Sequence, residues 1–122
     1  MPQHVAVVSS LDIDRILLRD YSGPRLLELR EAICATDVVE KDRVVAACMK
    51  IANGSAERLL KELRDAPGYY REILSEAEYP KASRKWSTIQ KLADAQQQHV
   101  YDQDRQQYEL WFHRVGRLAP KG

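Results

Sequence analysis

The fold is decided by residues 37–55, which read DVVEKDRVVAACMKIANGS. The start is typical of a helix N-terminus, because Asp37 can accept a backbone N–H bond and Glu40 stands where its side chain can reach back. At the other end, Asn53-Gly54-Ser55 joins a glycine suited to a helix C-terminus to a serine suited to cap the next helix. Between them we expect a helix whose buried face carries Val44, Val45, Ala47, Cys48, Ile51 and Ala52.

Two helices are expected before this stretch. Ser9 and Asp12 resemble a capping box at the start of the first helix, which Ser22-Gly23-Pro24 ends. The second helix should run from about residue 24 to 35, with Pro24 at its first position. Its apolar residues cover more than one stripe, which predicts packing on two sides. Basic and acidic residues alternate along both helices and predict a salt-bridged surface.

Three further helices are expected after it. One should span residues 56–65, and Pro67 should break it and open a short helix that ends at Tyr79-Pro80. From Ser83 to Leu118 the chain has no Pro and no Gly before Gly116, which predicts one long C-terminal helix. A thin apolar stripe on this helix predicts packing along one side.

The composition is that of a globular domain. The chain has 122 residues with 44% hydrophobic and 30% charged residues and a formal net charge of +1. We expect a single all-α domain over residues 1–122, built as stacked antiparallel helical hairpins in a short solenoid or a bundle. No stretch approaches the roughly 20 apolar residues of a membrane span, and the apolar run at residues 5–8 is too short for a signal peptide, so we expect a cytoplasmic protein.

A resemblance covers roughly the middle third of the chain. Residues 42–47, Gly54-Ser55, Pro67, residues 70–72 and the AEYP motif at residues 77–80 resemble small uncharacterised bacterial all-helical proteins. The helical hairpins are also similar to armadillo and HEAT repeats, which implies a protein-binding scaffold. Only about two hairpins fit before the C-terminal helix, whereas such scaffolds use three or more repeats.

The sequence predicts neither a metal site nor a cofactor. Cys34 and Cys48 lie in helical stretches and are expected to be buried thiols, and the histidines are scattered. An enzyme would have to assemble its site from dispersed residues such as His99, Glu109 and His113. Glu109 and His113 share a helix face, but this spacing is also that of an ordinary surface pair. We therefore expect no catalytic activity.

The leading functional prediction is a protein–protein interaction module, acting on a protein partner or on a second copy. Its candidate residues form an aromatic strip, defined as Tyr108, Trp111, Phe112 and Val115. Trp111 and Phe112 are adjacent and face directions about 100° apart, so one could seal the core while the other contacts a partner. Aromatic residues are enriched in binding hot spots. Burial of the whole strip by the protein's own helices is the alternative interpretation.

The second functional prediction is a nucleic-acid-binding or regulatory module. Its candidate residues are the basic cluster Lys81, Arg84, Lys85 and Trp86, in which basic side chains surround an aromatic ring. Such a group can hold a nucleic-acid strand by charge and stacking. The near-neutral net charge of the chain makes nucleic acid the weaker of the two partner predictions.

Overall fold

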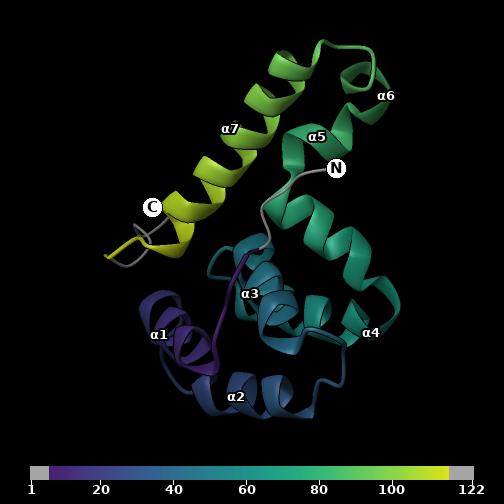
Figure 1. The fold of residues 1–122 in the computed structure, drawn as a ribbon. Helices are drawn as coiled ribbons and strands as arrows, with labels where there is room; N and C mark the ends of the chain where they lie inside the picture. The colour runs from purple at the N-terminus through teal and green to yellow at the C-terminus, as the bar shows by residue number, and fades with distance from the viewer. Residues whose placement is uncertain (1–5, 116–122) are drawn as a thin grey trace.

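The computed structural model describes residues 6–115, which form seven α-helices and no strand (Figure 1). This confirms the all-α prediction. None of the helices in this range is long and apolar enough to cross a bilayer. The helices are α1 (Ser10–Asp20), α2 (Leu26–Ala35), α3 (Lys41–Ala52), α4 (Ala56–Glu78), α5 (Pro80–Arg84), α6 (Trp86–Ile89) and α7 (Asp94–Phe112).

Helix α3 lies at the centre of the main core. Residues 44–49 are all buried, so α3 is covered on every side rather than along one stripe. Helices α4 and α1 pack against it, and α2 packs on α4 (Figure 1). Since α1 packs mainly on α3 and α2 packs mainly on α4, the predicted stack of hairpins is not confirmed.

Capping residues fix where the helices begin and end. Ser9 and Asp12 form the expected capping box: the Ser9 N–H donates to the Asp12 carboxylate at 3.0 Å, and the Asp12 N–H donates to Ser9 Oγ at 3.3 Å. Ser55 caps α4 as predicted. Before α3, however, the cap position is taken by Glu40, which has a left-handed backbone, and Asp37 does not serve as the cap.

Helix α4 is longer than expected and bent. It continues through Pro67 to Glu78, and Tyr69 is the residue with non-helical angles (φ −131°, ψ 23°). Proline lacks the N–H and crowds the preceding turn, so a bend is required here. The chain resumes the helix after the bend because both halves bury apolar side chains in the main core, among them Leu63 before the bend and Ile73 after it.

The expected continuous helix from Ser83 is wrong in its first part, because α5, α6 and a turn precede α7. Folding back brings Ile89 and Leu92 against Val100 and Tyr101 in a second, small hydrophobic cluster. A straight helix would leave these side chains in water, so tertiary burial overrides local helix propensity. Residues 116–118, the expected end of this helix, lie outside the described residues.

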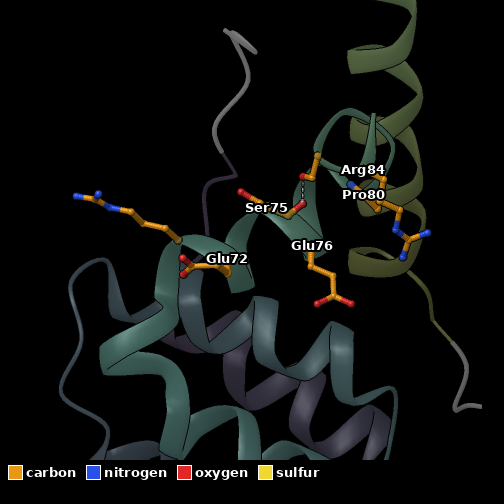
Figure 2. Close-up of a pocket in the computed structure, with 7 residues that line it drawn as sticks. Glu72, Ser75, Glu76, Pro80 and Arg84 are labelled. Carbon is orange, nitrogen blue, oxygen red and sulfur yellow. Dashed lines mark hydrogen bonds between the residues drawn. The ribbon is translucent and has the colours of Figure 1, made fainter. Parts of the chain in front are cut away.

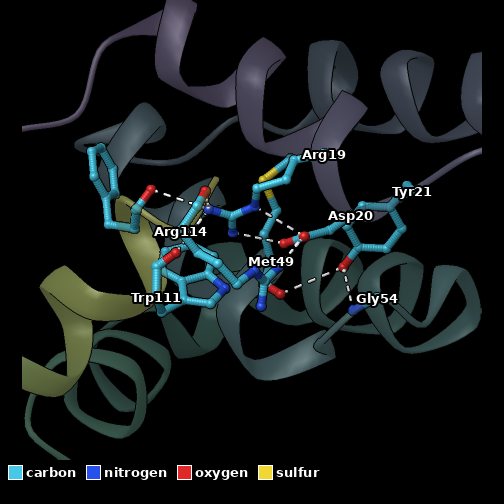
Figure 3. A network of polar contacts seen from close by, with 8 residues as sticks. Arg19, Asp20, Tyr21, Met49, Gly54, Trp111 and Arg114 are labelled. Atoms are coloured by element: carbon cyan, nitrogen blue, oxygen red, sulfur yellow. Dashed lines mark hydrogen bonds and ion pairs between the residues drawn. The ribbon is translucent and has the colours of Figure 1, made fainter. Parts of the chain in front are cut away.

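Arg19 links α1 to the C-terminal end of α7 through hydrogen bonds (Figure 3). Its side chain is buried and donates to the carbonyl oxygens of Trp111 at 2.8 Å, Phe112 at 3.2 Å and Arg114 at 3.0 Å. Asp20 balances the charge by accepting two further bonds from the Arg19 guanidinium. Arg19 is thus a buried cap for α7, not a member of the salt-bridged surface expected from the sequence.

Helix α2 and the cysteines correct two further expectations. Within α2 only Leu29 is buried, and Leu27 is 66% exposed, so α2 packs on one side. Cys34, at the end of α2, is exposed, whereas Cys48 on α3 is buried. Burial raises the pKa of the Cys48 thiol to about 12.

The core placement of α1 is tested by a pair of identical substitutions. Leu17 is fully buried and Leu11 is 77% exposed on the same helix. We expect Leu17→Ala to lower the free energy of unfolding by about 2–5 kcal/mol, because it leaves a cavity in the core. Leu11→Ala should change it by less than about 0.5 kcal/mol. Urea unfolding followed by circular dichroism measures both, and equal losses would contradict the fold.

The two thiols should differ in reactivity. The thiolate is the reactive form, and burial of Cys48 both blocks access of a reagent and raises the pKa of its thiol. In native protein treated with a maleimide, we expect mass spectrometry to find one adduct, on Cys34. Denatured protein should carry adducts on both cysteines. Rapid labelling of Cys48 in the native state would show that α3 is not the centre of the core.

Candidate binding site

Asp104 organises the part of the molecule that carries the candidate site. Its carboxylate is fully buried and accepts bonds from the backbone N–H groups of Lys81 and Ala82, each at 3.0 Å. Bonds to an ionised acceptor are stronger than neutral ones. Gln107, on the same helix, donates to the Ala77 carbonyl at 3.1 Å. These bonds hold α5 and the end of α4 against α7.

A cavity of about 490 Å³ opens beside this anchor, and we call it the basic pocket. Its floor is aliphatic and comes from α6, the turn after it and α7. Its rim is basic and comes from α5 and from Lys85, the residue that follows α5. The residues that line it are Lys81, Arg84, Lys85, Thr88, Ile89, Leu92, Val100 and Gln103. The volume is within the range of about 300–1,000 Å³ that ligand pockets occupy.

The rim carries positive charge that the protein does not neutralise. Arg84 and Lys85 are exposed, and within residues 6–115 neither has an acidic partner. The Lys81 ammonium donates to the neutral Gln103 amide at 3.1 Å. The lining contains neither a carboxylate nor an imidazole. The pocket combines positive charge with an apolar floor.

The basic cluster predicted from the sequence is therefore largely assembled. Lys81, Arg84 and Lys85 meet at the rim of the basic pocket, whereas Trp86 lies outside the lining with 42% of its surface exposed. The sequence prediction missed the floor, Ile89, Leu92 and Val100. These residues come together only because the chain folds back between α6 and α7.

The aromatic strip is mostly part of the core. Tyr108 and Phe112 are buried in the main cluster and stack at 5.9 Å between ring centroids. Trp111 is partly buried, with its ring edge-on to Tyr108 and the Arg19 guanidinium over it at 5.4 Å. Val115 is 95% exposed. Tyr108 and Phe112 are thus core residues, because they lie on the face of α7 that covers the main cluster, and binding through the strip stays a prediction.

The dispersed polar residues do not form a site together. His99, Glu109 and His113 are all exposed. Glu109 and His113 line a small cavity of about 180 Å³ near Ala6 and Val7, to which His99 does not contribute. Within residues 6–115, no three His, Cys, Asp or Glu side chains lie close enough to hold a metal ion.

A second cavity of about 410 Å³ lies between the second half of α4 and α5 (Figure 2). Its lining has mixed charge, and Ser83 Oγ donates across it to the Ser75 carbonyl at 3.0 Å. Arg84 lines both cavities and so stands on the ridge that separates them. The lining residues are Arg71, Glu72, Ser75, Glu76, Pro80, Ser83 and Arg84.

Comparison with protein-family models, with curated proteins and with solved structures gave no match for this chain. The interpretation of the site therefore depends on its own geometry. In that geometry the basic pocket is a concave surface that combines one sign of charge with an apolar floor.

The anchor at Asp104 can be tested against its neighbour Asp102, which is exposed on the same helix. Asp104→Ala leaves the N–H groups of Lys81 and Ala82 without an acceptor, so we expect it to lower the free energy of unfolding by about 1–3 kcal/mol. Asp102→Ala should cost no more than about 0.5–1 kcal/mol. Hydrogen exchange should become faster at residues 80–92 in the Asp104 variant and stay slow in α3. Unchanged exchange at residues 80–92 would contradict this role.

Proposed function

We propose that this protein is a non-catalytic helical module that binds a partner protein, and that the basic pocket is its binding site. The observation that carries the proposal is the unneutralised basic rim above an aliphatic floor. Apolar contacts supply affinity and charges at a rim supply orientation and specificity. In this proposal helices α1 to α4 are the scaffold, a short stack of helices that presents α5 to α7 in the cytoplasm.

A protein partner fits the pocket better than a nucleic acid does. Proteins that hold single strands stack the bases on aromatic rings, but the floor of the basic pocket is Ile89, Leu92 and Val100. Trp86, the ring on which the nucleic-acid prediction depends, lies outside the lining. A net charge of +1 also gives little general attraction for a phosphate backbone.

Site-specific photo-crosslinking tests the proposal. A benzophenone amino acid at Thr88 lies in the pocket lining, and the same residue at Leu27 on α2 lies on an exposed surface away from it. In cells that naturally contain the protein, we expect the Thr88 variant to form a discrete protein adduct that the Leu27 variant does not form. Adducts that are the same at both positions, or a Thr88 adduct with nucleic acid alone, would overturn the proposal.

A further inference from the structure

We infer that the basic pocket takes an acidic amphipathic segment of the partner protein, in which two or more aliphatic side chains stand beside Asp or Glu residues. This inference depends on the proposed function and specifies the chemistry of its partner. It follows from the floor, the rim and the acidic groups nearby, taken in turn.

The floor calls for aliphatic side chains. Ile89 is already buried, but Leu92 and Val100 are only partly buried, so they keep apolar surface that a ligand can cover. A volume of about 490 Å³ is that of a pocket for a drug-sized ligand, which leaves room for more than one aliphatic side chain. The floor offers no aromatic ring for stacking.

The rim calls for carboxylates. Lys81 and Arg84 lie three positions apart on α5, and Lys85 is the non-helical residue that follows this helix. Like charges at this spacing repel each other and weaken a helix, so the cluster destabilises the helix in the free protein. An acidic ligand would offset this repulsion and add attraction between opposite charges.

The protein's own acidic groups do not supply this charge. The Asp104 carboxylate is occupied by two backbone N–H groups of α5, and Asp102 lies near Arg105 and accepts a bond from Gln98. Glu72 and Glu76 line the other cavity together with Arg84, but within residues 6–115 neither forms an ion pair with Arg84 or Lys85. We therefore assign the complementary charge to the bound segment.

Fluorescence polarisation with three labelled peptides of equal length tests the inference. The first is an amphipathic helix with a Leu face flanked by Glu. The second has Lys in place of every Glu, and the third has Gln in place of every Leu. We expect the Leu/Glu peptide to bind, with affinity that falls as salt is added, and both altered peptides to bind at least about tenfold more weakly.

Two variants with matched controls place the binding in the basic pocket. Arg84→Glu with Lys85→Glu should weaken binding of the Leu/Glu peptide at least about tenfold, whereas Arg30→Glu with Arg64→Glu, an equal charge change at two exposed positions, should leave it unchanged. Leu92→Gln should weaken it and Leu110→Gln, on the exposed side of α7, should not. If the glutamate pair unfolds, Arg84→Gln with Lys85→Gln serves in its place.

The outcomes separate this inference from the proposed function. Equal binding of the Lys peptide, no effect of the Arg84 and Lys85 changes, or displacement of the peptide by a single-stranded oligonucleotide overturns the acidic segment. If no peptide binds but the Thr88 crosslink yields a partner, the crosslinked tryptic peptide decides between two results. A segment rich in Leu or Ile with Asp or Glu supports the inference. A neutral or basic segment overturns it and leaves the protein-binding function standing.

Discussion

The burial of α3 on all sides is the constraint on which the rest of the structure depends. A helix that buries residues 44–49 without interruption needs neighbours all round it. Helices α1 and α4 supply most of this cover, and α4 bends at Tyr69 so that both its halves reach the core. Helix α7 joins only with its C-terminal half, through Tyr108 and Phe112.

The N-terminal half of α7 is consequently left outside the main core and needs a second cluster to cover it. Tyr101 belongs to that cluster, together with Ala82 and Ile89. The start of this part of the chain is fixed by Arg43 on α3, whose guanidinium donates to both Glu78 oxygens at 2.6 and 2.8 Å. The pKa of Arg43 is raised mainly by this hydrogen-bonded contact with Glu78. Since Glu78 is the last residue of α4, the pair sets the direction in which the chain leaves towards α5.

Much of the fold could be predicted from sequence because it depends on interactions between residues close together in the chain. The capping box at Ser9, the cap at Ser55 and the disruption near Pro67 all follow from chemistry within a few residues. The break between Ser83 and Asp94 could not be predicted in this way, because it is caused by contacts with residues further along the chain. For Asp104, the burial could be predicted from sequence but the hydrogen-bond partners could not.

The signal for Asp104 was present in the spacing of α7. Tyr101, Asp104, Tyr108 and Phe112 recur three to four positions apart, which is the spacing of a buried helix face. Burying a carboxylate costs free energy unless hydrogen-bond donors contact it. The position of Asp104 among buried aromatic residues therefore already implied buried N–H partners. Which residues supply those donors could not be read from the sequence.

The candidate site also has one part that the local sequence predicts and one part that depends on contacts between distant residues. Its basic rim could be read from the sequence because Lys81, Arg84 and Lys85 are close along the chain, whereas its floor joins residues on both sides of the turn before α7. A cluster as small as this one buries little surface, so its local stability is expected to be low. Repulsion between the basic side chains of the rim lowers this local stability further. A ligand that covers the floor and neutralises the rim would stabilise the folded form of α5 to α7 in particular, because binding to the native state alone adds to its stability. The proposed binding would therefore be coupled to local order at this site, and the main core around α3 would not have to change for the coupling to act.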